Sequence, residues 1–181
     1  MRQVVLVVIV IVGLPFAVVL AGNAQPYAGL ETRAIKALSE EQIADLRAGR
    51  GMGLALAAEL NGYPGPRHVI DLAEHLELTE AQRAEVQALF DAMRAETIPI
   101  GEMLIERETE LERQFAERTV TPASVSALTE AIGDIQGTLR AAHLRYHLAT
   151  LDALTPEQVE RYTELRGYKT GATGQHLHPM H

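Results

Sequence analysis

Two histidines in the stretch HLRYH, His143 and His147, are the residues of this 181-residue chain best suited to chemistry. They stand four positions apart, so on a helix both imidazoles project from the same face. Neutral imidazoles at this spacing can bind one Zn, Co, Ni or Cu ion. Two ligands make a weak site, so a third would come from another helix, a partner chain or the C-terminal tail. The alternative is that both histidines are solvated residues beside the apolar seam of their helix.

The C-terminal tail holds further candidate ligands. His176, His178 and His181 follow one another closely, with Met180 among them, and such a density is typical of short metal-binding tracts. Residues 168–181 otherwise contain few apolar side chains and are predicted to be disordered. The predicted ligand set is therefore His143, His147, His176, His178 and His181.

A second group of polar side chains, His68, Asp71 and His75, recurs at spacings of three and four residues. We expect a short helix over His68 to Leu76, with these residues on its flank. Solvent or arginine side chains are their expected partners, because the pattern alone is only a hint of metal binding.

Three glycines, Gly49, Gly51 and Gly53, superficially suggest a loop that cradles phosphate. No strand precedes them and no Lys-Ser/Thr pair follows, which argues against nucleotide binding. We instead predict a short apolar helix from Gly51 to Leu60, closed by the turns at Asn61-Gly62 and Pro64-Gly65-Pro66.

Composition argues against catalysis and against nucleic-acid binding. The chain has no Cys, no convincing Ser-His-Asp set and no His-Glu-x-x-His motif, so we predict that it is not an enzyme and holds no organic cofactor. Its net charge is -8 and no Lys/Arg cluster is present, which disfavours nucleic acid as a partner.

The elements that position these residues are predicted to be helices. Ser39 to Gln42 forms a capping box that opens a helix ending near Gly49. A long helix follows from Glu80 to about Glu117, with a kink or break expected before Pro99. Thr121-Pro122 then begins a second long helix, whose apolar seam predicts an antiparallel hairpin. The seam consists of Val125, Leu128, Ile132, Ile135, Leu139, Ala142 and Tyr146.

One motif occurs twice, as LTEAQ (Leu78 to Gln82) and as LTPEQ (Leu154 to Gln158). In each copy a Thr is followed three positions later by a Gln, which is the arrangement of a capping box. The predicted structural caps are Leu78, Thr79, Gln82, Leu154, Thr155 and Gln158. The second copy opens a last helix from Pro156 to Arg166, which Gly167 ends.

The first 24 residues have the features of an export signal. Arg2 precedes an apolar run from Val4 to Leu20, and Gly22-Asn23-Ala24 offers small residues for cleavage. A retained membrane anchor is the alternative, because the run is nearly long enough to span a bilayer. Both interpretations place the remaining chain outside the cytoplasm, in the periplasm.

Two LTxxQ motifs around a helical hairpin resemble the Spy/CpxP-like superfamily of periplasmic proteins, which includes heavy-metal resistance and sensor proteins of the ZraP and CnrX type. The resemblance covers about Arg67 to Gly167. It implies an all-α, four-helix cradle-like fold, often homodimeric, with the motif acting as a structural cap. Metal-binding members use His pairs on these helices. The cobalt and nickel sensors carry another His pair on their first helix, where this chain has Ile35 to Ser39 and Glu59.

The expected organisation is a signal segment (1–24), an N-terminal helical extension (25–66), a hairpin domain (67–167) and the tail (168–181). Three functions remain open at this point. The first is a heavy-metal resistance or sensor protein that binds a divalent transition metal in an envelope metal or stress response. The others are an ATP-independent chaperone that holds unfolded proteins, and an adaptor of a membrane sensor.

Overall fold

The computed structural model describes residues 25–168, so the predicted signal segment and most of the tail lie outside the described residues. Its contacts divide the chain into two units. Of the first only Gln25–Glu31 is described, and a short 3-10 helix (η1, Leu30–Thr32) begins there. The second unit, 32–168, contains six α-helices and no strand among its described residues. The predicted all-α class is therefore confirmed.

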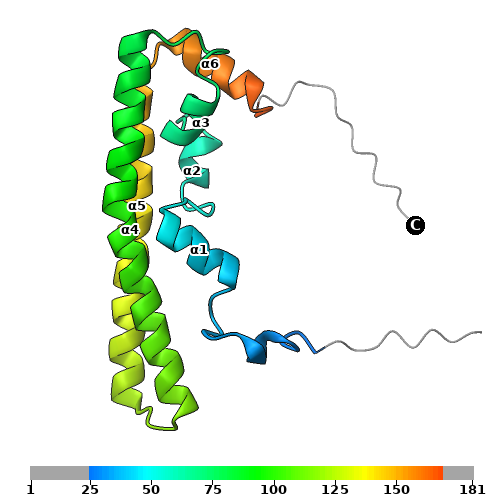
Figure 1. Cartoon of the computed structure of the whole chain (residues 1–181), viewed down its shortest axis with the longest axis vertical. Coiled ribbons are helices and arrows are strands. Elements are labelled where there is room, and N and C mark those ends of the chain that lie inside the picture. The colour runs from blue at the N-terminus through cyan, green and yellow to red at the C-terminus, as the bar shows by residue number, and fades with distance from the viewer. Residues whose placement is uncertain (1–24, 169–181) are drawn as a thin grey trace, which may run out of the picture. The chain divides into compact units, whose positions relative to one another are not determined.

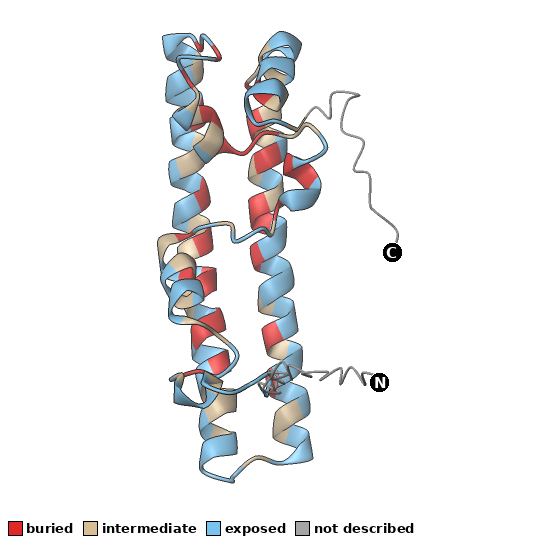
Figure 2. Ribbon diagram, turned by 90° about the vertical axis from the view of Figure 1, so that its right-hand side faces the viewer, coloured by how far each residue is buried: buried red, intermediate tan, exposed pale blue. Residues whose placement is uncertain are grey.

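A long hairpin of α4 (Glu80–Ala116) and α5 (Pro122–Asp152) forms the body of this unit (Figure 1). Its buried residues are spaced along both helices (Figure 2). The predicted seam is largely observed, and each fully buried Leu or Ile contributes roughly 1.5–3 kcal/mol. The core cluster contains Ile35, Leu46, Ile100, Leu104, Ile105, Ile132, Leu139 and Ala142.

Of the kink or break expected before Pro99, the break is absent, because α4 continues through this residue. Proline costs a helix interior about 3 kcal/mol, since it lacks an amide hydrogen. Helix α1 (Glu40–Ala48) packs on α4 at this point. A Cβ added to Gly101 would lie 2.7 Å from the carbonyl oxygen of Leu46, so the two helices are in close contact immediately after the proline.

The remaining helices are α2 (Leu56–Glu59), α3 (Pro66–Asp71) and α6 (Pro156–Leu165). Two predicted boundaries were wrong. The helix expected from Gly51 begins only at Leu56, because Met52 and Gly53 take positive φ values of 43° and 78°, which a right-handed helix does not accommodate. The helix expected over His68 to Leu76 already ends at Asp71, and turns follow it.

The two LTxxQ motifs meet at the open end of the hairpin. Thr79 and Thr155 each accept a hydrogen bond from the amide of the Gln three residues later, and both capping boxes are formed. Gln82 also donates to Ala153 O at 3.0 Å, and Gln158 donates to Leu76 O at 3.2 Å. The two glutamine side chains bond to each other as well, at 2.8 and 3.2 Å. The motif thus occurs twice because each copy caps its own helix and is hydrogen-bonded to the other copy.

These contacts enclose a second, smaller core between α3, α6 and the start of α4, which contains Val69, Ala73, Leu76, Leu78, Val86, Ala153 and Tyr162. In Figure 1, α1, α2 and α3 follow one another beside the hairpin, and α6 lies at its open end. No helix in the described part of the chain is long and apolar enough to cross a membrane.

Candidate metal centre

The structure buries both histidines of the HLRYH stretch. His143 is 2% exposed and His147 is 8% exposed, so the interpretation of the pair as solvated residues beside the seam is wrong. The buried face of α5 contains Leu139 and Ala142 and then both imidazoles. Tyr146, which was expected in the apolar seam, is only half-buried, and its hydroxyl donates to Glu96. Side chains buried in this way are held by packing, as a ligand pair requires.

The segment between α1 and α3 covers the imidazoles, and its glycines allow close approach. A Cβ on Gly51 would lie 3.6 Å from His143 Nδ1. A Cβ on Gly65 would lie 2.9 Å from His147 Cε1 and Nε2, which is too close for any larger residue without movement of the ring. The covering segment therefore fits these two rings closely.

His147 is fixed in one tautomer. Its Nδ1 lies 2.7 Å from the carbonyl oxygen of Tyr63. Because a carbonyl only accepts, Nδ1 carries the hydrogen and Nε2 keeps its lone pair. Metal-binding histidines are commonly oriented by such a bond from the non-ligating nitrogen to a backbone carbonyl. His147 is thus prepared to bind through Nε2.

His143 has a nitrogen with no partner. Its Nε2 is buried and makes no hydrogen bond with any residue from 25 to 168, which is costly for a polar atom inside a protein. Burial, and then electrostatic interaction with nearby His147, lower the pKa of His143. The ring is therefore neutral at physiological pH, the state in which an imidazole binds metal.

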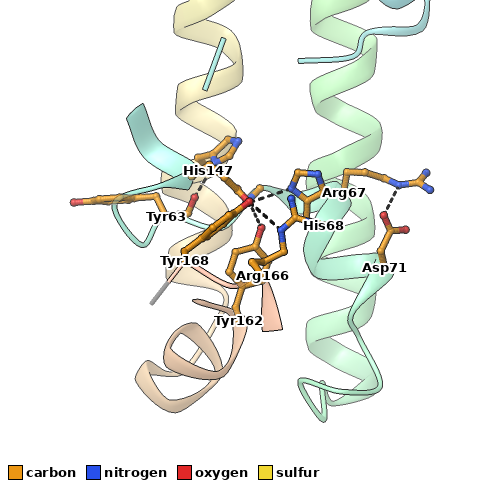
Figure 3. A network of polar contacts seen from close by, with 10 residues as sticks. Tyr63, Arg67, His68, Asp71, His147, Tyr162, Arg166 and Tyr168 are labelled. Carbon is orange, nitrogen blue, oxygen red and sulfur yellow. Dashed lines mark hydrogen bonds and ion pairs between the residues drawn. The ribbon is translucent and has the colours of Figure 1, made fainter. Parts of the chain in front are cut away.

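Glu59, on α2, is the buried carboxylate of this region, at 5% exposure. It accepts hydrogen bonds from the hydroxyls of Tyr162 at 2.5 Å and Tyr168 at 3.0 Å, and from Gly65 N at 3.2 Å. Figure 3 shows the side chains of Tyr162, Tyr168, Arg166 and His68 converging on this point. Its second oxygen, Oε2, lies 3.8 Å from His147 Nδ1, so Glu59 connects the histidine pair with α6.

Neighbouring polar side chains keep Glu59 ionised. Burial by itself would raise the pKa of Glu59, but contact with His68 and the bond from Tyr162 outweigh it and lower the pKa to about 2. His68 Nδ1 lies 3.2 Å from Oε1 without the direction of a hydrogen bond, so this contact is electrostatic. Arg166 Nε adds a contact with a cation at 3.5 Å. In turn, burial and the bond to Glu59 raise the pKa of Tyr162.

A cavity of about 710 Å³ opens beside these groups. His143, His147 and Glu59 form part of its wall, the loop 49–53 and the start of α3 form another part, and Phe90 and Met93 of α4 complete it. Two imidazoles, a carboxylate and open space thus adjoin one another.

The second group of polar side chains is only partly brought here. Asp71 pairs with Arg67 at 3.0 Å, and His75 is exposed, so the second group is dispersed and only His68 reaches the cavity. His176, His178 and His181 lie outside the described residues. Within 25–168, no three or more His, Cys, Asp or Glu side chains are arranged so that they could hold a metal ion.

Sequence reasoning did not assign a role to Glu59, Tyr162 or Tyr168. The available signal was a single acidic residue within the apolar run GLALAAEL. A charge in such a run predicts either an exposed turn or a buried carboxylate with partners.

Comparison with known proteins agrees with this picture at the level of the family. Searches of curated proteins and of solved structures found no match. Residues 51–161 match the family model described as heavy-metal resistance. This range includes the cover segment, the hairpin, both LTxxQ motifs and the buried histidine pair, and it is more than half of the chain. The chain therefore belongs to the heavy-metal resistance family.

Proposed function

We propose that this protein binds a divalent transition metal through His143 and His147, as a periplasmic protein of the metal-binding ZraP/CnrX type. The observation that carries the proposal is the state of the two rings. Both are buried on one wall of a cavity, Nε2 of His143 has no partner, and Tyr63 holds His147 in the tautomer that leaves its Nε2 available.

The residues present suit Zn, Co, Ni or Cu, because imidazole is a preferred ligand of these ions. A third donor is required for tight binding. Glu59 is the nearest carboxylate, but it is held by Tyr162 and Tyr168, so recruiting it would cost those hydrogen bonds. The tail is the other source of donors, through His176, His178 and His181. Bound metal would link α5 to whichever segment supplies the third ligand.

The test is isothermal titration of the protein produced from the full chain with Zn, Co, Ni and Cu. Three variants accompany it: His143→Ala/His147→Ala, the triple alanine variant of His176, His178 and His181, and His75→Ala. The exposed His75 is the matched control. We expect one tight site that is lost in the double variant and unchanged in His75→Ala. Weakening in the triple variant would identify the tail as the third donor.

A folding control separates loss of ligand from loss of structure. His143→Gln/His147→Gln keeps polar side chains of similar size, and circular dichroism reports whether the helices persist. Metal binding that survives in this folded variant would overturn the proposal. If the unmodified protein binds no metal but suppresses aggregation of unfolded proteins, the chaperone function replaces it.

A further inference from the structure

The cavity beside the histidines is much larger than a metal ion needs. One water molecule occupies roughly 30 Å³ of liquid, whereas this cavity measures about 710 Å³. Pockets for small organic molecules are typically about 300–1,000 Å³. The space therefore suits a molecule rather than a bare ion.

The charge of the wall also favours a cation that is accompanied by an anion. Four guanidinium groups line the cavity, against two carboxylates: Arg50, Arg67, Arg94 and Arg166, with Asp45 and Glu59. Arginines are always charged, whereas the whole chain carries a net charge of -8. Because Arg94 has no carboxylate partner among the described residues, its positive charge opposes a divalent cation that enters alone and makes its binding less tight. An accompanying anion would remove the repulsion.

Arg94 is the arginine available to such an anion. Arg50 pairs with Asp45 at 2.5 Å, Arg67 pairs with Asp71 at 3.0 Å, and Arg166 contacts Glu59. Arg94, in contrast, forms no ion pair with a carboxylate in the described residues. Its Nε donates to the carbonyl oxygen of Ala48 at 3.3 Å, which leaves the terminal nitrogens for a ligand. A guanidinium binds a carboxylate through two parallel hydrogen bonds.

The glycine-containing loop offers donors of a second kind. Gly51, Met52 and Gly53 line the cavity, and their backbone N–H groups donate to no acceptor in the part of the chain that the structure describes. Met52 and Gly53 have positive φ values. Successive amides in turns of this kind are common anion-binding features. The loop lacks the sequence of a nucleotide-binding motif, but its unpaired amides are available to bind an anion.

The remaining wall is apolar and favours a ligand with a carbon skeleton over an inorganic ion. Leu56, Phe90 and Met93 line this part of the cavity. The guanidinium groups of Arg67 and Arg94 lie 5.8 and 5.9 Å from the centre of the Phe90 ring, so the charged and apolar surfaces adjoin each other.

We propose that the cavity receives the metal together with a small organic carboxylate that chelates it. This inference rests on the proposed metal binding by His143 and His147. The imidazoles bind the metal, the carboxylate supplies the ligands that the chain lacks, and Arg94 with the loop amides binds the anion. The ligand is thus a metal chelate of net negative or neutral charge.

Equilibrium dialysis tests this with Co²⁺ and radiolabelled citrate as probes, on the protein produced from the full chain. The variants are Arg94→Gln and Arg83→Gln. Arg83, which is also on α4, is the matched control, because its Nε likewise donates to a backbone carbonyl, that of Leu78, at 3.3 Å and it lies outside the cavity. We expect retention of cobalt and citrate in equal amounts. Citrate retention should fall roughly tenfold or more in Arg94→Gln and remain unchanged in Arg83→Gln.

Ethylenediamine, a chelator that forms a cationic cobalt complex, provides the second control and should not be retained with the metal. Retention of cobalt without citrate would overturn this inference and leave metal binding by the histidines intact. Equal citrate retention by Arg94→Gln would also overturn it. If cobalt is retained under no condition, the proposed function fails, and this inference fails with it.

Discussion

The two halves of the α4–α5 hairpin are built differently. Toward its turn, the hairpin buries aliphatic side chains such as Leu128 and Ile132. Toward its open end, it buries His143, His147 and Thr150, and the segment between α1 and α3 packs on them. Thr150 satisfies its hydroxyl within the helix, by donating to Tyr146 O at 2.6 Å, whereas His143 keeps an unpaired nitrogen.

This difference indicates that the half near the turn mainly provides stability and that the half near the open end carries the candidate site. A protein gains stability from an aliphatic core, and it violates the packing rules mainly at sites that have a function. The half near the turn follows the rules almost throughout, with Glu108 as a buried carboxyl whose pKa burial raises. The half near the open end breaks them at His143. Substitutions in the two halves should therefore differ in their effects on the free energy of unfolding and on metal binding.

The largest effect on stability is expected from Leu139→Ala, in the aliphatic core at 3% exposure. Loss of the buried side chain leaves a cavity and should lower the free energy of unfolding by about 2–5 kcal/mol. Urea denaturation measures it. Leu148→Ala, on the same helix at 53% exposure, is the control and should cost less than about 0.5 kcal/mol. Similar losses for the two variants would contradict the described core.

Glu59→Gln should have the next largest effect. The substitution keeps the shape but removes the charge that His68 and Arg166 contact, and it weakens the bonds from both tyrosines. We expect a loss of about 1–3 kcal/mol in urea denaturation. The exposed Glu74→Gln should change little. A neutral result for Glu59→Gln would show that the carboxylate does not hold α6 in place.

Gln82→Ala tests the contact between the two LTxxQ motifs. It removes one side of a capping box and the bonds to Ala153 O and Gln158. We expect a loss of about 1–2 kcal/mol. Gln87→Ala, on the exposed surface of α4, removes only a bond to Asp91 and is the matched comparison. Equal values for the two glutamines would mean that the motifs act as separate caps.

Acid should destabilise the half near the open end in two steps. Because the pKa of His143 is lowered from 6.5, the unfolded chain takes up a proton that the folded chain does not, and stability falls as the pH decreases below about 6.5. One such group contributes at most about 1.4 kcal/mol per pH unit.

Glu59 supplies the second step. Its ionised form contributes stability above about pH 4.5, and this is lost as the pH approaches its folded pKa of about 2. His143→Gln should remove only the first step and Glu59→Gln only the second, as measured by urea midpoints across pH. An unchanged profile in His143→Gln would contradict the burial of a neutral ring.

The smallest change in stability is expected for His143→Leu. Leucine has a similar volume and no unpaired nitrogen, so the free energy of unfolding should change by less than about 1 kcal/mol or rise. Metal binding should nevertheless disappear in the titration. A large loss of stability would show that the buried ring is part of the packing rather than a site kept for a ligand.

Local signals predicted most of the fold. The capping boxes at Ser39, Thr79 and Thr155 begin helices as expected, because a cap depends on residues within one turn. The prediction failed where contacts between distant segments decide. The break that Pro99 could cause is absent from α4, where α1 packs close by, and the start of α2 depends on the backbone at Met52.

Only part of the candidate site could be predicted from the sequence, for the same reason. His143 and His147 form a local pattern, which their spacing reveals. The bond between Tyr162 and Glu59 joins residues 103 positions apart, and no periodicity within a helix indicates it. The burial of the pair also depends on a covering segment from outside the hairpin, so an analysis of α5 alone placed the histidines at the surface.

Gly65 carries a consequence for mutational scanning. Its φ of -85° and ψ of 145° are ordinary values that any residue can adopt. Its backbone therefore imposes no requirement for glycine. The requirement comes from the ring of His147, 2.9 Å from where a Cβ would stand. In a mutational scan scored for metal tolerance, alanine at position 65 should be rejected. If residue 147 is first replaced by a small residue, alanine at position 65 should be accepted in a scan that is scored only by the amount of folded protein.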